Sequence, residues 1–274
     1  MADCPKPMVC NRCGAEGHLV RECTEEEKTR QFVDEEGKTQ EIYVPGAEID
    51  ATELYKQGIQ TGINFSKYEN IPIQVTGENV IEAISSFREA GLRKLLIDNL
   101  SKSDYQVPTP IQKHAIPNIM QSRDLMACAQ TGSGKTAAFL LPIIHKLIEA
   151  EAESLGCAGL STQTPQCVVV TPTRELAIQI HNEARKFAQG SLIKSVVVYG
   201  GTSVNYQSAQ MGKGCNLLVA TPGRLMDYVE RGKISFSCLK FLVLDEADRM
   251  LDMGFMPDIK RAVETSSMPD KGER

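Results

Sequence analysis

The sequence predicts an α/β fold in which helices flank a parallel sheet. Three observations lead to this prediction: short apolar runs recur after about residue 80, each run ends in a loop of small or polar residues, and each loop leads into a stretch with helical periodicity. Strands that alternate with helices join through right-handed crossovers, which make the strands parallel and place helices on both faces. The five predicted strands are residues 125–129, 167–170, 196–199, 217–220 and 241–244.

The composition is that of a globular protein with a sizeable core. The 274 residues are 42% hydrophobic and 24% charged. No apolar run approaches the roughly 18 residues of a membrane span, and the first residues lack the apolar segment of a secretory signal. We therefore expect no membrane partner, and we expect the scattered cysteines to be small buried hydrophobes in a reducing, intracellular compartment.

Three regions are expected along the chain. Residues 1–23 are rich in cysteine, and residues 80–274 hold all the predicted strands. Residues 24–79 are polar and weakly periodic, which predicts a flexible linker. Between residues 22 and 41 there are eight acidic residues against three basic ones, a balance equal to the net charge of −5 of the whole chain. The chain outside these residues is therefore near neutral, and its charges can still include a local basic face.

A glycine-rich loop at residues 129–136 has the sequence Ala-Gln-Thr-Gly-Ser-Gly-Lys-Thr. Glycines let the backbone curl around phosphate groups, where a side chain would collide. The lysine neutralises β- and γ-phosphate charge, and the hydroxyl after it binds Mg²⁺. Ala129 stands where the general pattern has glycine. The predicted nucleotide-binding residues are Thr131, Gly132, Ser133, Gly134, Lys135 and Thr136.

Two adjacent carboxylates, Asp245 and Glu246, follow the last predicted strand. Parallel sheets bind their ligands at the carboxyl ends of the strands, where every polar loop of this chain falls. We expect Asp245 to hold the same Mg²⁺ as Thr136, and Glu246 to orient or deprotonate the attacking water, so that Lys135, Asp245 and Glu246 are catalytic. The alternative is a glycine-rich turn and an unrelated, solvated acidic helix start.

These motifs resemble those of the first RecA-like domain of the DEAD-box RNA helicases, from about Phe87 onward. The resemblance includes Asp-Tyr-Gln-Val-Pro-Thr-Pro-Ile-Gln at residues 104–112, which is similar to the family's Q motif, and Phe87 at its upstream aromatic position. It implies that Gln112 reads the adenine edge and that Tyr105 packs on the ring, so the cofactor is ATP with Mg²⁺. An amide can pair with adenine's donor and acceptor. The alternative for Gln112 is a polar residue at a helix N-terminus.

Three further loops are similar to the RNA-contacting motifs of this family. Hydroxyl groups, glycine N–H groups and helix N-termini suit phosphate oxygens, and arginine adds positive charge. Such contacts hold the backbone of single-stranded RNA or a short duplex without reading sequence. For each threonine, helix capping is an equally open alternative. The implied RNA-binding residues are Pro172, Thr173, Arg174, Gly200, Gly201, Thr221, Pro222, Gly223 and Arg224.

The cysteine-rich start resembles a retroviral-type zinc knuckle. Its predicted Zn²⁺ ligands are Cys10, Cys13, His18 and Cys23. Three thiolates and one imidazole complete a tetrahedral shell, and so short a segment needs the metal to fold. Such knuckles bind single-stranded RNA; the alternative is a chance cluster. Cys4 and Pro5 resemble the tail of a preceding knuckle, which suggests that the numbered start lies inside a longer protein.

The segment before the Q motif narrows the resemblance. Residues 63–68 and 71–77 resemble the corresponding segment of the Vasa-type subfamily, and the zinc knuckle fits that subfamily too. This implies a role in germ cell development, protein partners in germ granules, and a cytoplasmic, perinuclear location, with a nuclear location as the alternative.

The activity that the resemblance implies is RNA-stimulated ATP hydrolysis coupled to local unwinding of RNA duplexes. The family's next motif, Ser-Ala-Thr, and its second RecA-like domain do not occur in these 274 residues. That domain supplies arginine fingers, so we expect the chain alone to bind ATP weakly and to be nearly inactive. The alternatives are an RNA-binding scaffold that binds nucleotide without hydrolysing it, and a P-loop ATPase acting on DNA or protein.

Overall fold

In the computed structural model, the described residues are 30–33, 39–42, 51–56, 73–153 and 162–270. The chain divides into two compact units, each taken by itself. The smaller unit comprises residues 1–47 and 201–206, and the larger unit comprises residues 48–200 and 207–274. The predicted zinc ligands lie outside the described residues.

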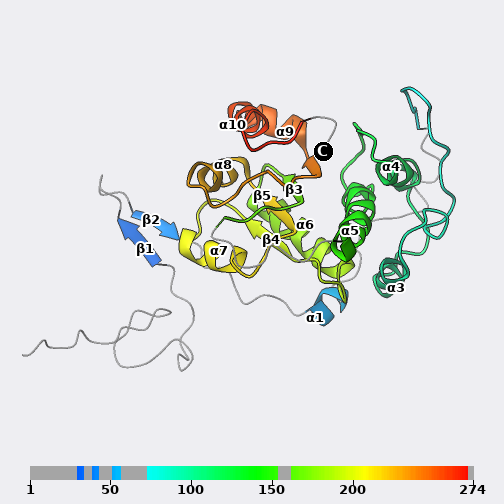
Figure 1. The fold of residues 1–274 in the computed structure, drawn as a ribbon, viewed down its shortest axis with the longest axis horizontal. Helices are drawn as coiled ribbons and strands as arrows, with labels where there is room; N and C mark the ends of the chain where they lie inside the picture. Colours follow the sequence, from blue (N-terminus) through cyan, green and yellow to red (C-terminus); the bar gives the residue numbers. More distant parts are fainter. Residues whose placement is uncertain (1–29, 34–38, 43–50, 57–72, 154–161, 271–274) are drawn as a thin grey trace, which may run out of the picture. The chain divides into compact units, whose positions relative to one another are not determined.

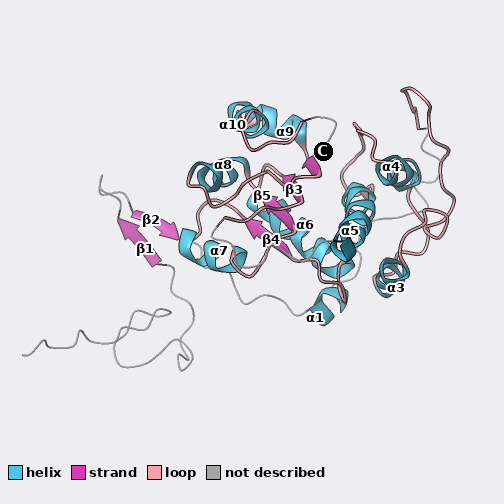
Figure 2. Ribbon diagram, in the orientation of Figure 1, coloured by secondary structure: helices cyan, strands magenta, loops and turns pink. Residues whose placement is uncertain are grey.

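A parallel sheet of four strands forms the centre of the larger unit (Figure 2). Its strands are β3 (Cys167–Val170), β4 (Ser195–Val198), β5 (Leu217–Ala220) and β6 (Phe241–Leu244), in the order β4-β5-β3-β6. Cys167 lies opposite Leu217 on one side and Phe241 on the other, so the three strands start level with one another. The predicted parallel α/β fold is confirmed, with β4 starting one residue earlier than expected.

The first predicted strand, residues 125–129, is not a strand in the structure, so that prediction is wrong. Leu125 is 45% exposed and Met126 is 92% exposed. A strand needs a neighbour that takes its backbone hydrogen bonds. Within the described ranges, β6 pairs with β3 alone and no strand pairs with residues 125–129. This apolar segment therefore lies at the surface, directly before the glycine loop.

Helices cover both faces of the sheet (Figure 1). On one face lie α3 (Lys94–Lys102), α4 (Pro110–Met120), α5 (Lys135–Glu153) and α6 (Arg174–Phe187), and on the other lie α8 (Pro222–Glu230) and α10 (Met256–Val263). Val169 belongs to the main core with residues of α5 and α6, whereas Val170 packs toward α8 and α10. The alternation of a β-strand thus sends neighbouring side chains into two different layers.

Two short helices follow strands and complete the order of elements along the chain. These are α7 (Val204–Met211), after β4, and α9 (Ala247–Asp252), after β6. Among the helices of the described part of the chain, none has the length and apolar character that crossing a membrane requires.

The region predicted as a linker, residues 24–79, also contains short elements. In the smaller unit, β1 (Arg30–Val33) and β2 (Thr39–Ile42) form an antiparallel pair. In the larger unit, α1 (Ala51–Lys56) packs on α6, where the Tyr55 hydroxyl donates to the carbonyl oxygen of Lys186 at 2.9 Å. Aromatic and β-branched side chains in an otherwise polar stretch favour such local structure.

One buried amide, that of Asn99, joins α3 to the end of α6. Its Nδ2 donates to the carbonyl oxygens of Phe187 (2.9 Å) and Gln189 (2.8 Å), and the residue is only 2% exposed. The core side of the sheet is therefore held by polar contacts as well as by apolar packing.

The substitution Asn99→Ala is expected to lower the free energy of unfolding by about 2–4 kcal/mol, because two buried carbonyl groups lose their donor. Urea denaturation followed by circular dichroism measures the change. Ser101→Ala, on an exposed position of the same helix, is the control and should stay within about 0.5 kcal/mol of the unaltered chain. Equal losses in the two variants would contradict this account of Asn99.

Candidate functional site

The hydrogen-bond ladder of the sheet continues one residue beyond three strands. The N–H groups of Thr171, Thr221 and Asp245 each donate to the last carbonyl of the neighbouring strand, at 3.0, 3.1 and 2.9 Å. Because the strands are parallel, the loops after them open at the same edge of the sheet. The predicted Mg²⁺ ligand Asp245 therefore shares this edge with the starts of two predicted RNA-binding loops.

The glycine loop has the geometry of a phosphate cradle. Gly132 and Gly134 have φ angles of +81° and +91°, which glycine adopts readily and other residues rarely do. The Ser133 hydroxyl is buried and has no hydrogen-bond partner within the described residues. The first turn of α5 begins at Lys135 and presents backbone N–H groups that lack helical acceptors. A nucleotide phosphate supplies acceptors for these groups, so the loop fits this ligand.

Gly134 packs closely against the start of α4. A Cβ atom at position 134 would lie 2.5 Å from Nε2 of Gln112 and 3.0 Å from Oγ1 of Thr109. The Gln112 side chain is fully buried: its Nε2 donates to the carbonyl of Gly134 (3.1 Å), and its Oε1 accepts the N–H of Thr109 (2.9 Å). Gln112 therefore acts as a polar residue at a helix N-terminus, which was the alternative to adenine recognition. It also joins α4 to the glycine loop.

The ammonium group of Lys135 donates hydrogen bonds to its own loop. Its Nζ donates to the carbonyl oxygens of Ala129 (2.5 Å) and Gln130 (3.2 Å). These carbonyls hold the cation beside the glycine loop. Binding of a phosphate would replace these neutral acceptors with charged ones, which form stronger hydrogen bonds.

The carboxyl group of Asp245 is buried and lies within reach of the Lys135 charge. Burial raises the pKa of Asp245, the Lys135 ammonium lowers it, and neighbouring carboxylates raise it again. The pKa is raised overall, so the ionised form is held at a cost. A divalent cation beside this carboxylate would favour the ionised form, as the predicted Mg²⁺ site requires.

Glu246 lies next to Asp245 in a strained backbone conformation. Its φ of +51° is left-handed, which costs a residue with a side chain of the order of 1–3 kcal/mol. Its carboxylate accepts a hydrogen bond from Nη1 of Arg249 at 3.2 Å, and its side chain is 24% exposed. The bond to Arg249 takes one of the two carboxylate oxygens, and the other can still accept a hydrogen bond from a water.

The two aromatic residues of the Q-motif resemblance, Phe87 and Tyr105, pack in or against the main core. Phe87 is 5% exposed and belongs to the main core. The ring of Tyr105 meets that of Phe187 edge-on, with centroids 5.7 Å apart. Burial and the Glu183 carboxylate raise the pKa of Tyr105. The structure thus brings Gln112 to the glycine loop and gives these two rings core contacts, and adenine recognition by the three residues stays a prediction.

The loop after β3 combines capping with an accessible arginine. The Thr173 side chain accepts the N–H of Leu176 at 3.3 Å, so the capping alternative holds for this threonine. Pro172 is buried. Arg174 is bonded to Glu175 at 2.9 Å, yet its side chain is 39% exposed. Its guanidinium group can therefore meet a phosphate at the surface.

The loops after β4 and β5 have room for a backbone to approach. A Cβ added at Gly200, Gly201 or Gly223 would meet nothing within 4 Å. Thr221 is the residue before α8 and makes no side-chain capping bond within the described residues, and buried Pro222 opens that helix. Arg224 differs from the other RNA candidates, because its side chain is only 12% exposed.

The sequence patterns did not identify two residues at this edge of the sheet, Thr171 and Gln207. Thr171 is fully buried, and its hydroxyl has no hydrogen-bond partner among the residues that the structure describes. Its place directly after an apolar run and before Pro172 was the available signal. Gln207 on α7 is buried and hydrogen-bonded to Arg224, and no motif marks it.

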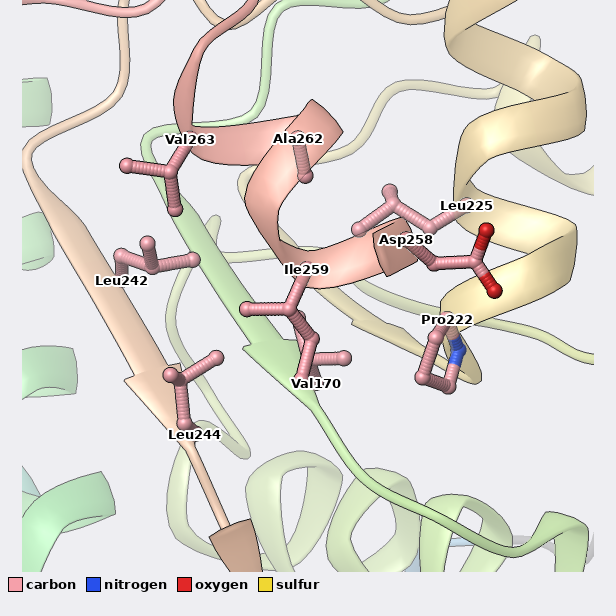
Figure 3. Close-up of a pocket in the computed structure, with 9 residues that line it drawn as sticks. All are labelled: Val170, Pro222, Leu225, Leu242, Leu244, Asp258, Ile259, Ala262 and Val263. Carbon is pink, nitrogen blue, oxygen red and sulfur yellow. The ribbon is translucent and has the colours of Figure 1, made fainter. Parts of the chain in front are cut away.

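A separate pocket lies between β3 and β6 on one side and α8 and α10 on the other (Figure 3). Its lining is apolar apart from Asp258, whose carboxylate is bonded to Arg261 at 2.5 Å. Leu242 and Leu244 point into it from β6. With no free charge or donor, this pocket does not suit a nucleotide, and the glycine loop remains the candidate site. Among the described residues, no group of three or more histidine, cysteine, aspartate or glutamate side chains could hold a metal ion.

Two family profiles match the chain. The profile of the DEAD/DEAH box helicases covers residues 109–273, and that of the zinc knuckle covers residues 8–25. The second match supports the predicted knuckle, and its predicted ligands Cys10, Cys13, His18 and Cys23 lie outside the described residues.

Similar proteins carry helicase names. The chain is 54% identical over 231 residues to the ATP-dependent RNA helicase vasa of Drosophila melanogaster, covering 84% of this chain and 34% of that protein. It is 47% identical over 295 residues to a probable ATP-dependent RNA helicase vasa-like of Penaeus vannamei, covering 97% of this chain and 40% of that protein. The chain thus spans well under half the length of these relatives.

A solved structure has the same fold. The RNA helicase Prp28 from Chaetomium thermophilum, in a crystal structure bound to ADP, is 38% identical with a TM-score of 0.62, over 70% of this chain and 46% of that one. The predicted RecA-like fold and the Vasa-type resemblance are therefore confirmed. Since the helicase profile matches more than half of the residues and includes both the glycine loop and the paired acids, the chain belongs to the DEAD/DEAH box helicase family.

Proposed function

We propose that this chain is the ATP-binding and RNA-binding part of an ATP-dependent RNA helicase, which hydrolyses ATP on binding RNA and separates short duplexes. The observation that carries the proposal is the glycine loop: Gly132 and Gly134 have positive φ angles, and the buried Ser133 hydroxyl has no hydrogen-bond partner among the described residues. ATP supplies the phosphoryl group and Mg²⁺ supplies charge neutralisation when both are bound.

Each residue of the site has a defined part in this proposal. The N–H groups after Gly134 and the ammonium of Lys135 bind the phosphates and neutralise their charge. The Thr136 hydroxyl and the Asp245 carboxylate hold the metal. Glu246 orients the attacking water through the carboxylate oxygen that Arg249 does not contact. The burial of Asp245 limits competition from bulk water.

RNA is the proposed partner because the same edge of the sheet carries loops suited to a phosphate backbone. Arg174 offers an accessible positive charge, and the glycines at 200 and 223 leave open space for a close approach. Cys10, Cys13, His18 and Cys23 would hold Zn²⁺ and fold a knuckle that binds single-stranded RNA. A germ-granule location and protein partners stay predictions.

One observation favours the alternative of a scaffold that binds nucleotide without hydrolysing it. The hydrogen bond from Arg249 engages one oxygen of the Glu246 carboxylate, which hydrolysis needs. The two functions differ in turnover, and they do not differ in binding.

We expect the full-length protein to hydrolyse ATP faster with single-stranded RNA than with DNA of the same sequence. Glu246→Gln should lower this turnover by about a hundredfold or more while ATP still binds, because a positioned base contributes that much. Phosphate release measures the rate. Glu264→Gln, on a largely exposed side chain of the same charge, is the control. Binding of RNA and ATP without turnover would favour the scaffold.

Lys135→Gln should weaken ATP binding and lower turnover by about a hundredfold or more, because it removes the charge aimed at the phosphates. Titration with a fluorescent ATP analogue gives the affinity. Lys260→Gln makes the same charge change on a 69% exposed side chain of α10 and should leave the affinity as it was. Undiminished affinity in Lys135→Gln would remove the basis of the proposed site.

Gly134→Ala should reduce ATP affinity about tenfold or more, because the new Cβ would collide with Gln112 and distort the cradle. The same titration measures the effect. Gly232→Ala is a matched control: its φ is also positive, at +65°, but nothing lies within 4 Å of the added atom. The control should lose stability and keep its ATP affinity. Loss of affinity in both variants would point to general unfolding.

A further inference from the structure

Gln207 is a buried residue outside every motif, yet it connects three elements of the larger unit. It lies on α7 and is 2% exposed. Its Nε2 donates to the carbonyl oxygen of Tyr199 at 3.1 Å, at the end of β4. Its Oε1 accepts from Nη1 of Arg224 at 3.2 Å and from the hydroxyl of Tyr228 at 3.4 Å, both on α8.

The contacts of Gln207 require an amide. The donor end meets a backbone carbonyl, while the acceptor end meets a guanidinium and a phenol. A carboxylate has no donor for the carbonyl of Tyr199, and an apolar side chain would leave three polar groups without this partner in a buried place. The geometry therefore depends on glutamine at this position.

Arg224 is enclosed on several sides by the same group of residues. Besides its bond to Gln207, its Nε lies 3.9 Å from the carboxylate of Asp227, and its guanidinium lies 5.7 Å from the centre of the Tyr228 ring. Its side chain is 12% exposed, against 39% for Arg174. A phosphate reaches an arginine only where the side chain is accessible, and Arg174 is the more exposed of the two.

These contacts join two of the candidate RNA-binding loops. Tyr199 immediately precedes Gly200, and Arg224 immediately follows Gly223. Because the Gln207 side chain bonds to Tyr199 and to Arg224, it fixes the distance between the two loops. This distance decides whether their backbone groups can meet successive phosphates. Long side chains and loops that are ordered before binding cost less conformational entropy on binding.

We infer that Gln207 and Arg224 are positioning residues, which hold the loops after β4 and β5 at the spacing of an RNA backbone while Arg224 itself makes no phosphate contact. This inference rests on the proposed RNA-binding function. It assigns the direct charge contact at this edge to Arg174 and an indirect role to Arg224.

The test is the salt dependence of RNA affinity in the full-length protein. Anisotropy of a labelled single-stranded oligouridylate, with a non-hydrolysable ATP analogue present, gives affinity at several salt concentrations. Each phosphate contact on a single strand contributes about 0.7 to the slope of log affinity against log salt. Arg174→Ala should lower this slope by about that amount.

Arg224→Ala and Gln207→Leu should each weaken RNA binding by about tenfold with an unchanged slope, since each loses loop geometry and neither loses a phosphate contact. Arg224→Lys keeps the charge and lacks the planar fork, so it should weaken binding as Arg224→Ala does. In the Arg224→Ala background, Gln207→Leu should weaken RNA binding by less than about a further threefold. ATP affinity should stay the same in all these variants.

A lower slope in Arg224→Ala, or full affinity in Arg224→Lys, would show a direct phosphate contact and overturn the inference. Full affinity in a folded Gln207→Leu variant would also overturn it. If Gln207→Leu fails to fold, the two Arg224 variants, whose altered side chain lies at the rim of the buried group, decide the question. Absence of RNA binding by the unaltered protein would instead refute the proposed function.

Discussion

The hydrogen bonds on both sides of β3 fix where the loops after β3 and β6 begin. Because β5 and β6 start level with β3, the Thr171 N–H donates to the last carbonyl of β5, and the Asp245 N–H donates to the last carbonyl of β3, at the same height. A slip of β6 by one residue would move Asp245 by about 3.3 Å and turn it to the other face of the sheet. The two faces of β6 resist such a slip, since Val243 packs in the main core and Leu244 faces the other layer.

This register also explains the electrostatics of the site. It places the carboxyl group of Asp245 where water is largely excluded, and burial raises its pKa. The Lys135 ammonium offsets part of that cost, but its donors are already bonded to carbonyls of its own loop. The pair therefore does not form a closed ion pair that satisfies itself. The Asp245 carboxylate could therefore meet the positive metal of a bound metal nucleotide, and the Lys135 ammonium could meet its negative phosphates.

Local patterns in the sequence predicted four strands, the glycine loop and the paired acids, because periodicity and turn chemistry are properties of neighbouring residues. They failed for residues 125–129, since an apolar run becomes a strand only beside a distant partner. They also could not separate Arg174 from Arg224. Both arginines follow a strand and a Thr-Pro dipeptide, and only the contacts with Gln207, Asp227 and Tyr228 enclose the second.

Two buried glutamines use the same chemistry on the two parts of the site. Gln112 joins the start of α4 to the glycine loop, and Gln207 joins α7 to the loops after β4 and β5. An amide carries a donor and an acceptor on one rigid plane, so it can fix a loop to a helix in one orientation without bringing a charge into the interior. Functional groups held in this way lose little further freedom on binding. Because the two glutamines are neutral, they add no charge at this edge of the sheet. A phosphate or a metal would meet the charges of Lys135, Asp245 and Arg174.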